Sequence, residues 1–124
     1  MIQESGEMYL ETILILSGVK EFVRSVDIAR RLGYSKPSVS RAMKNLKEEG
    51  YIDIDDNGHI FLLEKGRAVA ARIYERHEVL TKCLISLDAD PKIAEEDACR
   101  IEHYISDKTF DALKAHMKEH GAQL

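Results

Sequence analysis

The chain has few cysteines and no long hydrophobic run, and each absence excludes a class of protein. Only Cys83 and Cys99 occur among 124 residues, too few for the disulfide framework of a small secreted protein. The longest apolar run, Ile13 to Leu16, is far shorter than the roughly 20 residues that cross a membrane. The N-terminus has no basic stretch followed by an apolar one, so no secretory signal is expected. We therefore predict a cytoplasmic, soluble protein without a membrane partner, in which Cys99 is reduced and available to a metal.

A glycine-rich phosphate-binding loop is also missing, which argues against one large class of enzymes. Hydrophobic residues make up 44% of the chain and charged residues 32%. That balance suits a compact folded chain, either one unit or two small ones, and is not typical of a disordered segment.

The charge is low overall but unevenly distributed. The net charge is −4, yet the segment 20–48 contains eight basic and three acidic residues, so the remainder of the chain carries −9. A basic segment within an acidic protein indicates that this part of the chain meets a polyanion while the rest has another task.

Capping residues predict three short helices in the first half of the chain. Ser5 can cap a helix that ends at about Ser17, and Ser25 can cap a second helix that ends before Gly33. Ser35 can cap a third, in which Pro37 is tolerated in the first turn. Two short helices joined by a tight bend predict a helix-turn-helix whose second helix enters the major groove. The alternative is a helical hairpin with an ordinary solvated face.

The third predicted helix has two distinct faces. Apolar residues recur at i, i+3, i+4 and i+7 and form a core face: Val39, Ala42, Met43 and Leu46. Hydroxyl and cationic side chains on the other face can donate to phosphates or reach base edges. The predicted DNA-binding residues are Ser35, Lys36, Pro37, Ser38, Ser40, Arg41 and Lys44.

The segment YIDIDDNGHIFLL predicts a β-hairpin, because its first arm alternates and Asn57-Gly58 favours a two-residue turn. Three helices followed by a hairpin predict a winged helix over residues 1–63. Its wing is acidic, so we do not expect the wing to bind DNA phosphates strongly. His59 is expected to be solvated.

The second half changes character and predicts helices only. Residues 64–87 form one long amphipathic helix with His77 on its apolar stripe, Asp90 and Pro91 open the next helix, and Ser106 or Asp107 caps the last. The fold class is thus mainly α with a small β-hairpin. We predict that residues 64–124 form a helical dimerisation domain, since so few helices cannot build a separate core, and that the chain is a homodimer.

The segment DACRIEH carries the candidate chemistry. Cys99, Glu102 and His103 share one face of a helix at i, i+3 and i+4, so a thiol, a carboxylate and an imidazole would project together as metal ligands. A free cysteine in a helix is more often a small buried hydrophobe, and a Glu-His pair more often lies on the surface. Two further alternatives are a redox-sensing thiol at Cys99 and an enzyme with a nucleophile site.

Four segments, taken with the order of elements, resemble one family. These are EMYLETI at residues 7–13, SKPSVSRAMKNL at 35–46, Arg76-His77, and EEDACRIEH at 95–103 with a serine soon after. Together they look like the diphtheria toxin repressor and manganese transport regulator family of metal-dependent transcriptional repressors, over about residues 5–120. The chain is similar to the short form without the SH3-like domain of longer iron-responsive members.

The resemblance implies a metal site. In the iron-responsive branch the principal ligands would correspond here to Met8, Cys99, Glu102 and His103. The manganese branch has aspartate at the position of Met8 and glutamate at the position of Cys99, so this chain departs from it at both. Glu11, however, matches the manganese branch.

The resemblance also implies a second, ancillary site at His77, Thr81 and Glu95. The threonine and glutamate replace the family's usual glutamate and histidine, and Thr81 is a poor ligand. The site would form if Glu11 and Glu95 complete it with His77.

Ligand softness bears on the choice of metal. A thiolate and a thioether favour iron(II), cobalt, nickel or zinc over manganese, which prefers oxygen ligands. We therefore expect iron(II) first and manganese(II) second in the cell, with zinc, cobalt or nickel binding in vitro. The family implies a repressor of metal-homeostasis genes that binds a pseudo-palindromic DNA operator, and no catalytic activity. A winged-helix regulator controlled by thiol redox or by another ligand is the alternative.

Overall fold

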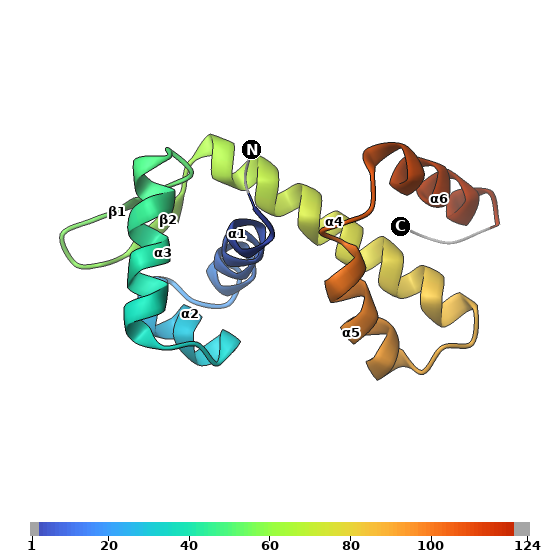
Figure 1. Cartoon of the computed structure of the whole chain (residues 1–124), viewed down its shortest axis with the longest axis horizontal. Coiled ribbons are helices and arrows are strands. Elements are labelled where there is room, and N and C mark those ends of the chain that lie inside the picture. Colours follow the sequence, from blue (N-terminus) through green and yellow to red (C-terminus); the bar gives the residue numbers. More distant parts are fainter. Residues whose placement is uncertain (1–2, 121–124) are drawn as a thin grey trace. The chain divides into compact units, whose positions relative to one another are not determined.

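The computed structural model describes residues 3–120 (Figure 1). Within this range the first half contains α1 (Glu4–Ser17), α2 (Ser25–Leu32), α3 (Lys36–Glu48), β1 (Ile52–Ile54) and β2 (Ile60–Leu62). The second half contains α4 (Glu64–Ser86), α5 (Pro91–Ile101) and α6 (Asp107–Glu119). The predicted fold class, mainly helical with a winged helix-turn-helix first, is confirmed.

The chain forms two compact units, Met1–Ala71 and Arg72–Leu124, whose boundary falls inside α4. Within residues 3–120, no helix is both long and apolar enough to cross a membrane.

The first unit is organised around one hydrophobic core. The apolar faces of α1, α2, α3 and the hairpin meet there, and the largest fully buried side chains are Leu10, Ile13, Ile28, Val39, Met43 and Ile52. The predicted core face of α3 is correct at Val39, Met43 and Leu46, whereas Ala42 is only partly buried. Packing of this face leaves the opposite face of α3 in solvent.

The helix starts were only partly predicted. Ser35 caps α3, since its Oγ accepts from the Ser38 amide at 3.3 Å. By contrast, α1 begins one residue before Ser5 with Gln3 at its N-cap, and Ser25 is the first residue of α2 rather than its cap. Asp27 instead accepts from the Arg24 amide at 2.9 Å and satisfies an amide that the helix leaves open.

We expect Asp27→Ala to destabilise the protein by about 1 kcal/mol at pH 7, the usual effect of losing a helix-capping carboxylate. A hydrogen bond from Lys20, 2.7 Å away, lowers the pKa of Asp27 below its ordinary 3.8, and the bond from the Arg24 amide adds to this. A lowered folded-state pKa stabilises the fold above the unfolded-state value, and the contribution is lost as the pH falls through the folded-state pKa. Urea denaturation should therefore show the difference between variant and wild type shrinking below pH 4.

The matched control is Asp56→Ala in the exposed wing, where we expect a change within about 0.5 kcal/mol. A difference for Asp27→Ala that stays constant down to pH 3 would contradict the role of its charge.

The hairpin has a longer turn than the two-residue turn predicted from Asn57-Gly58. The strands are antiparallel with Ile54 opposite Ile60, the Asp55 amide donates to the His59 carbonyl, and Gly58 adopts a φ of 78°. This is a three-residue loop in which glycine takes the left-handed position. His59 is also buried, contrary to expectation, because its ring stacks on Phe22 with centroids 4.0 Å apart.

The second unit contains most of α4, followed by α5 and α6. Asp90 caps α5 by accepting from the Ile93 amide at 3.2 Å, and Pro91 is its first residue, as predicted. Ser106, one of the two residues considered, caps α6 by accepting from the Thr109 amide at 3.1 Å. The apolar side chains buried in this unit are Ile73, Val79, Leu80, Ala94, Ala98, Phe110 and Met117.

Candidate functional site

Three potential metal ligands converge in the second unit. His77 Nδ1 lies 2.9 Å from Glu102 Oε2 and 3.6 Å from Cys99 Sγ. One donor atom from each of the three residues lies within 4.8 Å of the other two. Cys99 is exposed, His77 is half-buried, and Glu102 is 1% exposed. The group thus has a buried carboxylate at its base and a thiol open to solvent.

The local fold explains this convergence. His77 projects from α4, and Cys99 lies in the last turn of α5. The helix ends at Ile101, yet Glu102 keeps helical φ and ψ of −57° and −26°, so it remains one turn from Cys99 on the same face. His103 lies in the following turn rather than in the helix, contrary to the single helix expected through DACRIEH.

His103 lies beside this group rather than within it. Its Nε2 is 3.5 Å from Glu102 Oε1, so the two carboxylate oxygens of Glu102 face two different imidazole rings. The side chains of His103 and Glu102 are 4% and 1% exposed. Glu102 is therefore the common neighbour of both histidines.

Glu95, predicted for the ancillary site, faces the other nitrogen of the His77 ring. Glu95 Oε1 is 4.0 Å from His77 Nε2, and its side chain is mostly exposed. The Thr81 hydroxyl donates to the His77 carbonyl at 2.7 Å, a use that fits its expected weakness as a ligand. Met8 and Glu11, the remaining predicted ligands, lie on α1 in the first unit, Met8 partly buried and Glu11 buried.

Arg76 holds the turn that carries Glu102. Its guanidinium donates to the carbonyls of Glu102, at 3.2 Å, and Ile105, and it pairs with Asp107 at the start of α6. The side chain is 4% exposed. One buried cation thus satisfies open carbonyls after α5 and fixes this turn against α4.

Sequence analysis gave Arg76 no role beyond its place in a motif. A signal was present, because Arg76 lies three residues after Ile73 and four before Leu80, on the apolar stripe of the long helix. A charged residue at such a position is rarely buried without a partner.

The neighbours of His77 hold a proton on its ring. Hydrogen bonds to Cys99 and to Glu102 raise the pKa of His77 to about 10, and this outweighs partial burial, which lowers it. A metal that binds through Nδ1 must displace that proton, so binding has to release protons.

The donor set fits a divalent transition metal. A thiolate, an imidazole and a carboxylate are the ligand types that iron(II), cobalt(II) and zinc share, and a carboxylate buried beside two imidazoles adds negative charge. The buried turn held by Arg76 keeps one ligand fixed in advance.

A second candidate site lies on α3. Lys36, Ser40, Arg41 and Lys44 are exposed on this helix, while Ser35 and Ser38 form its first turn. Ser35 Oγ donates to Ser38 Oγ at 2.8 Å, and Arg41 donates to the same Ser38 oxygen at 3.4 Å. Pro37 occupies the first turn, as expected.

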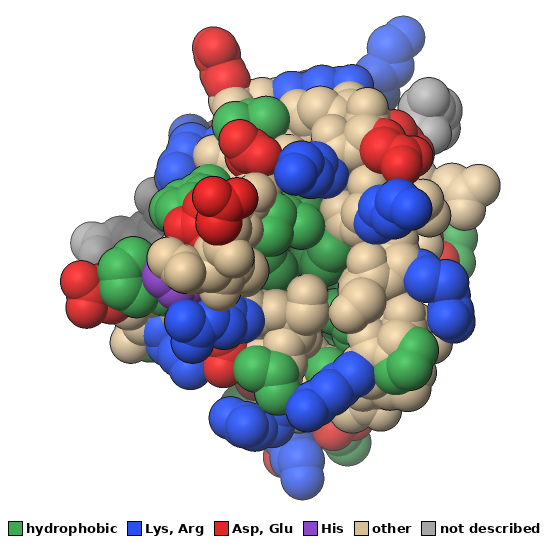
Figure 2. All heavy atoms as spheres, turned by 90° about the vertical axis from the view of Figure 1, so that its left-hand side faces the viewer, with side chains coloured by type: hydrophobic (Ala, Val, Ile, Leu, Met, Phe, Trp, Pro, Cys, Tyr) green, Lys and Arg blue, Asp and Glu red, His purple; other side chains and the backbone are tan. Residues whose placement is uncertain are grey.

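Figure 2 faces the side of the molecule that carries α3 and the hairpin, and it shows Lys and Arg side chains around much of the margin, with acidic side chains among them. The wing contributes Asp53, Asp55 and Asp56, all exposed. Exposed basic side chains thus come from α3 and also from α2 (Arg30 and Arg31), whereas the wing is acidic.

Comparisons with known proteins match two successive family domains. Residues 1–60 match the N-terminal DNA-binding domain of iron dependent repressors, and residues 63–121 match the iron dependent repressor metal binding and dimerisation domain. The chain is 36% identical over 115 residues to the transcriptional regulator MntR of Escherichia coli O6:H1, covering 93% of this chain and 74% of that protein.

Two further similar proteins are named for the metal to which they respond. The chain is 31% identical over 105 residues to the iron-dependent repressor IdeR of Mycobacterium tuberculosis, covering 84% of this chain and 46% of that protein. The solved structure of the manganese regulator SloR superposes with a TM-score of 0.81 at 28% identity, covering 91% of this chain and 53% of that chain.

The chain thus spans about half the length of IdeR and of the solved SloR chain. The relatives are DNA-binding transcription regulators and not enzymes, as predicted. With two family models over almost its whole length, and a relative of such identity and coverage, this chain belongs to the iron-dependent repressor family of metal-dependent transcription regulators.

Proposed function

We propose that this chain is a metal-activated transcriptional repressor of metal-homeostasis genes, which as a homodimer binds a pseudo-palindromic DNA operator. The convergence of His77, Cys99 and Glu102 in the second unit carries the proposal. The exposed cationic face of α3 supports the DNA-binding part. Met8 and Glu11 remain proposed ligands on the family resemblance, and His103 and Glu95 on that resemblance together with their distances to Glu102 and His77.

Iron(II) is the proposed physiological metal, with manganese(II) second. The relatives include both an iron-dependent repressor and a manganese regulator. Cys99 favours iron, because a thiolate is a soft ligand and manganese prefers oxygen. Zinc would bind such a donor set tightly in vitro, since affinity generally rises along the first-row series.

The chain's own residues supply the steps of the switch. Glu102 presents a buried carboxyl group to His77 of α4, Arg76 holds the turn that carries Glu102, and His77 and Cys99 give up protons when they become ligands. A bound divalent cation supplies the positive charge that this set shares. To shift the protein from a population that mostly cannot bind DNA to one that mostly can, metal binding must favour the DNA-binding state by about 5 kcal/mol.

A redox-sensing thiol is the second candidate, because Cys99 is exposed and lies 3.6 Å from a protonated imidazole. Oxidation of Cys99 in metal-free protein, with a matching change in DNA affinity, would favour it.

The test is an anaerobic fluorescence anisotropy titration. DNA sites are first enriched from a random duplex library with cobalt-loaded protein, and binding is then measured with iron(II), manganese(II) or no metal. We expect iron(II) to tighten binding at low concentration, and Cys99→Ala to remove most of that gain. Affinity that is indifferent to both metals would overturn the proposal.

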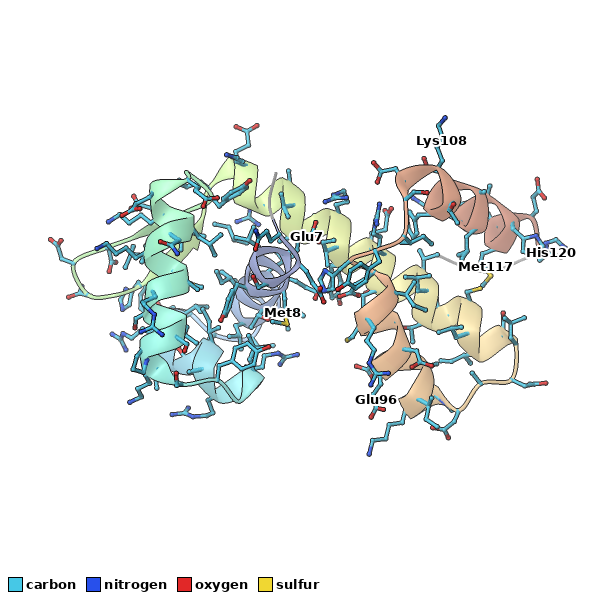
Figure 3. The ribbon with its side chains drawn as sticks, viewed as in Figure 1. Glu7, Met8, Glu96, Lys108, Met117 and His120 are labelled. Carbon is cyan, nitrogen blue, oxygen red and sulfur yellow. The ribbon has the colours of Figure 1, made fainter. Side chains whose placement is uncertain are left out.

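The role of α3 has its own prediction. Lys44→Ala should weaken DNA binding several-fold at every sequence and lower the salt dependence by about one ion, as expected for one phosphate contact. Lys108→Ala is the matched control, because Lys108 is exposed on α6 in the second unit (Figure 3). Equal effects of the two substitutions would contradict a specific role for α3.

A further inference from the structure

The hydroxyl oxygen of Ser38, in the first turn of α3, accepts two hydrogen bonds. Ser35 Oγ donates to it at 2.8 Å, and Arg41 Nη2 donates to it at 3.4 Å. The direction of the second bond is unambiguous, because a guanidinium has no acceptor. Ser38 therefore joins the N-cap of α3 to the side chain of Arg41.

The Ser38 oxygen is itself held in place by the start of the helix. Ser35 Oγ accepts from the Ser38 amide at 3.3 Å and donates to the Ser38 hydroxyl, so two bonds fix the pair. Val39, the next residue, is fully buried in the core of the first unit. Since residues at i and i+3 are neighbours on a helix surface, this fixed oxygen lies beside the Arg41 side chain.

The charge of Arg41 is available to an external acceptor. Arg41 is exposed, and among residues 3–120 its polar partner is Ser38, with no carboxylate paired to it. Lys47, on the same helix, differs because its Nζ lies 3.9 Å from a carboxylate oxygen of Asp53 in the wing. Arg41 thus combines a preferred direction with an unpaired positive charge.

The shape of the guanidinium indicates which acceptor fits. It is planar and can present a parallel pair of N–H donors on either of two edges, and one bond to Ser38 occupies at most one edge. Such a pair matches the O6 and N7 acceptors of guanine in the major groove, whereas adenine has a donor in place of O6. Arg41 lies in the second turn of α3, and residues near the start of a recognition helix contact base edges.

We propose that Arg41 contacts a guanine in each half of the operator, and that Ser38 is a positioning residue that orients the guanidinium for this contact. The inference rests on the proposed function, in which α3 contacts DNA. Orienting a long side chain in advance lowers the conformational entropy lost on binding. A phosphate contact would carry no sequence information, so the two roles of an arginine can be separated by experiment.

The first experiment compares the sites that cobalt-loaded wild type and Arg41→Ala enrich from a random duplex library. We expect each half of the wild-type site to contain a guanine that the variant no longer selects. Changing that guanine to adenine should weaken wild-type binding about 10- to 100-fold, the range of one bidentate base contact, and binding of the variant less than about twofold. Identical site preferences for both proteins, with uniformly weaker binding by the variant, would overturn the proposal.

A modified base gives a sharper comparison. Replacing the selected guanine by 7-deazaguanine removes N7 and leaves base pairing intact, so binding should weaken for the wild type and not for Arg41→Ala. Lys47→Ala is the matched control, because it removes from the same helix a cation that already pairs with Asp53. The control should keep the wild-type base preference. If it loses the same preference, the effect belongs to the charge of the helix and the role of Arg41 is wrong.

Ser38→Ala tests the positioning role. Ser35 can still accept from the amide of residue 38, so the start of α3 should be kept. The preference for guanine over adenine should fall about three- to tenfold, the range of one net hydrogen bond, and Ser38→Thr, which keeps a hydroxyl, should restore it. In the Arg41→Ala background, Ser38→Ala should not change the preference further. A loss of affinity that is equal at every sequence would contradict the positioning role.

Failure of the proposed function is distinguishable. If metal-loaded wild type enriches no DNA site, the chain is not a sequence-specific repressor and the proposed function fails. If it enriches a site in which no base depends on Arg41, only the role of Arg41 is wrong.

Discussion

Glu102→Gln should weaken the binding of cobalt(II) or iron(II) by about 100-fold or more. Glutamine keeps the shape of the side chain and removes its charge, so the fold should tolerate it. The carboxylate is 1% exposed and faces His77 through one oxygen and His103 through the other. Loss of an outer-sphere partner alone typically costs 10- to 100-fold in metal affinity, and a ligand that also supplies charge should cost more.

Cobalt(II) titration measures this directly, because coordination by a thiolate gives an absorption band. Glu96→Gln is the matched control, since Glu96 is exposed on α5, the helix that precedes Glu102 (Figure 3), and the substitution removes the same charge. We expect the control to stay within about twofold of the wild type. If the two variants bind cobalt equally well, the His77, Cys99 and Glu102 group is not the metal centre.

Arg76→Met is expected to lower the free energy of unfolding by about 2–4 kcal/mol. The substitution keeps an unbranched apolar chain in place but leaves the carbonyls of Glu102 and Ile105 without this donor. A buried polar group that loses its partner costs about 1–3 kcal/mol, and two are affected here. Urea denaturation of metal-free protein gives the value, provided that the second unit unfolds in a single transition.

Two variants separate the contributions of Arg76. Asp107→Asn removes the charge of an exposed carboxylate that pairs with Arg76 and Arg72, leaves the carbonyl contacts of Arg76, and should cost less than about 1 kcal/mol. Arg76→Lys keeps the charge, but lysine is shorter and has no second nitrogen to pair with Asp107 while the first donates to both carbonyls, so most of the loss should remain. If lysine restores full stability, charge rather than the carbonyl contacts accounts for the role of Arg76.

Arg76→Met should also weaken metal binding, because Glu102 lies in the turn that Arg76 holds. Asp107→Asn, which leaves both carbonyl contacts, should change metal affinity much less.

The sequence by itself determined the features that depend on neighbouring residues. Ser35, Asp90 and Pro91 marked helix starts correctly, because a cap involves amides only two or three residues away. The apolar spacing of α3 predicted its buried face, and the face opposite followed from it. The spacing of Cys99 and Glu102 placed both on one side of α5, and the combined motifs indicated the family.

Predictions from local sequence patterns were wrong where nearby residues offered another cap, turn or packing contact. Asp27 rather than Ser25 satisfies an amide at the start of α2. The turn at Asn57-Gly58 is one residue longer than predicted, and Phe22 covers a histidine expected in solvent. In each case the sequence is compatible with more than one local arrangement.

Only the tertiary structure decided which ligands meet. The family resemblance implied an ancillary site for His77 and the principal site for His103. In the structure, His77 Nδ1 faces Cys99 and Glu102, and His103 lies on the other side of the carboxylate. Packing of α5 against α4 sets these distances, and Arg76 of α4 fixes the turn that follows α5. Such contacts join residues more than 20 positions apart, and their geometry depends on how whole helices pack, which no local spacing encodes.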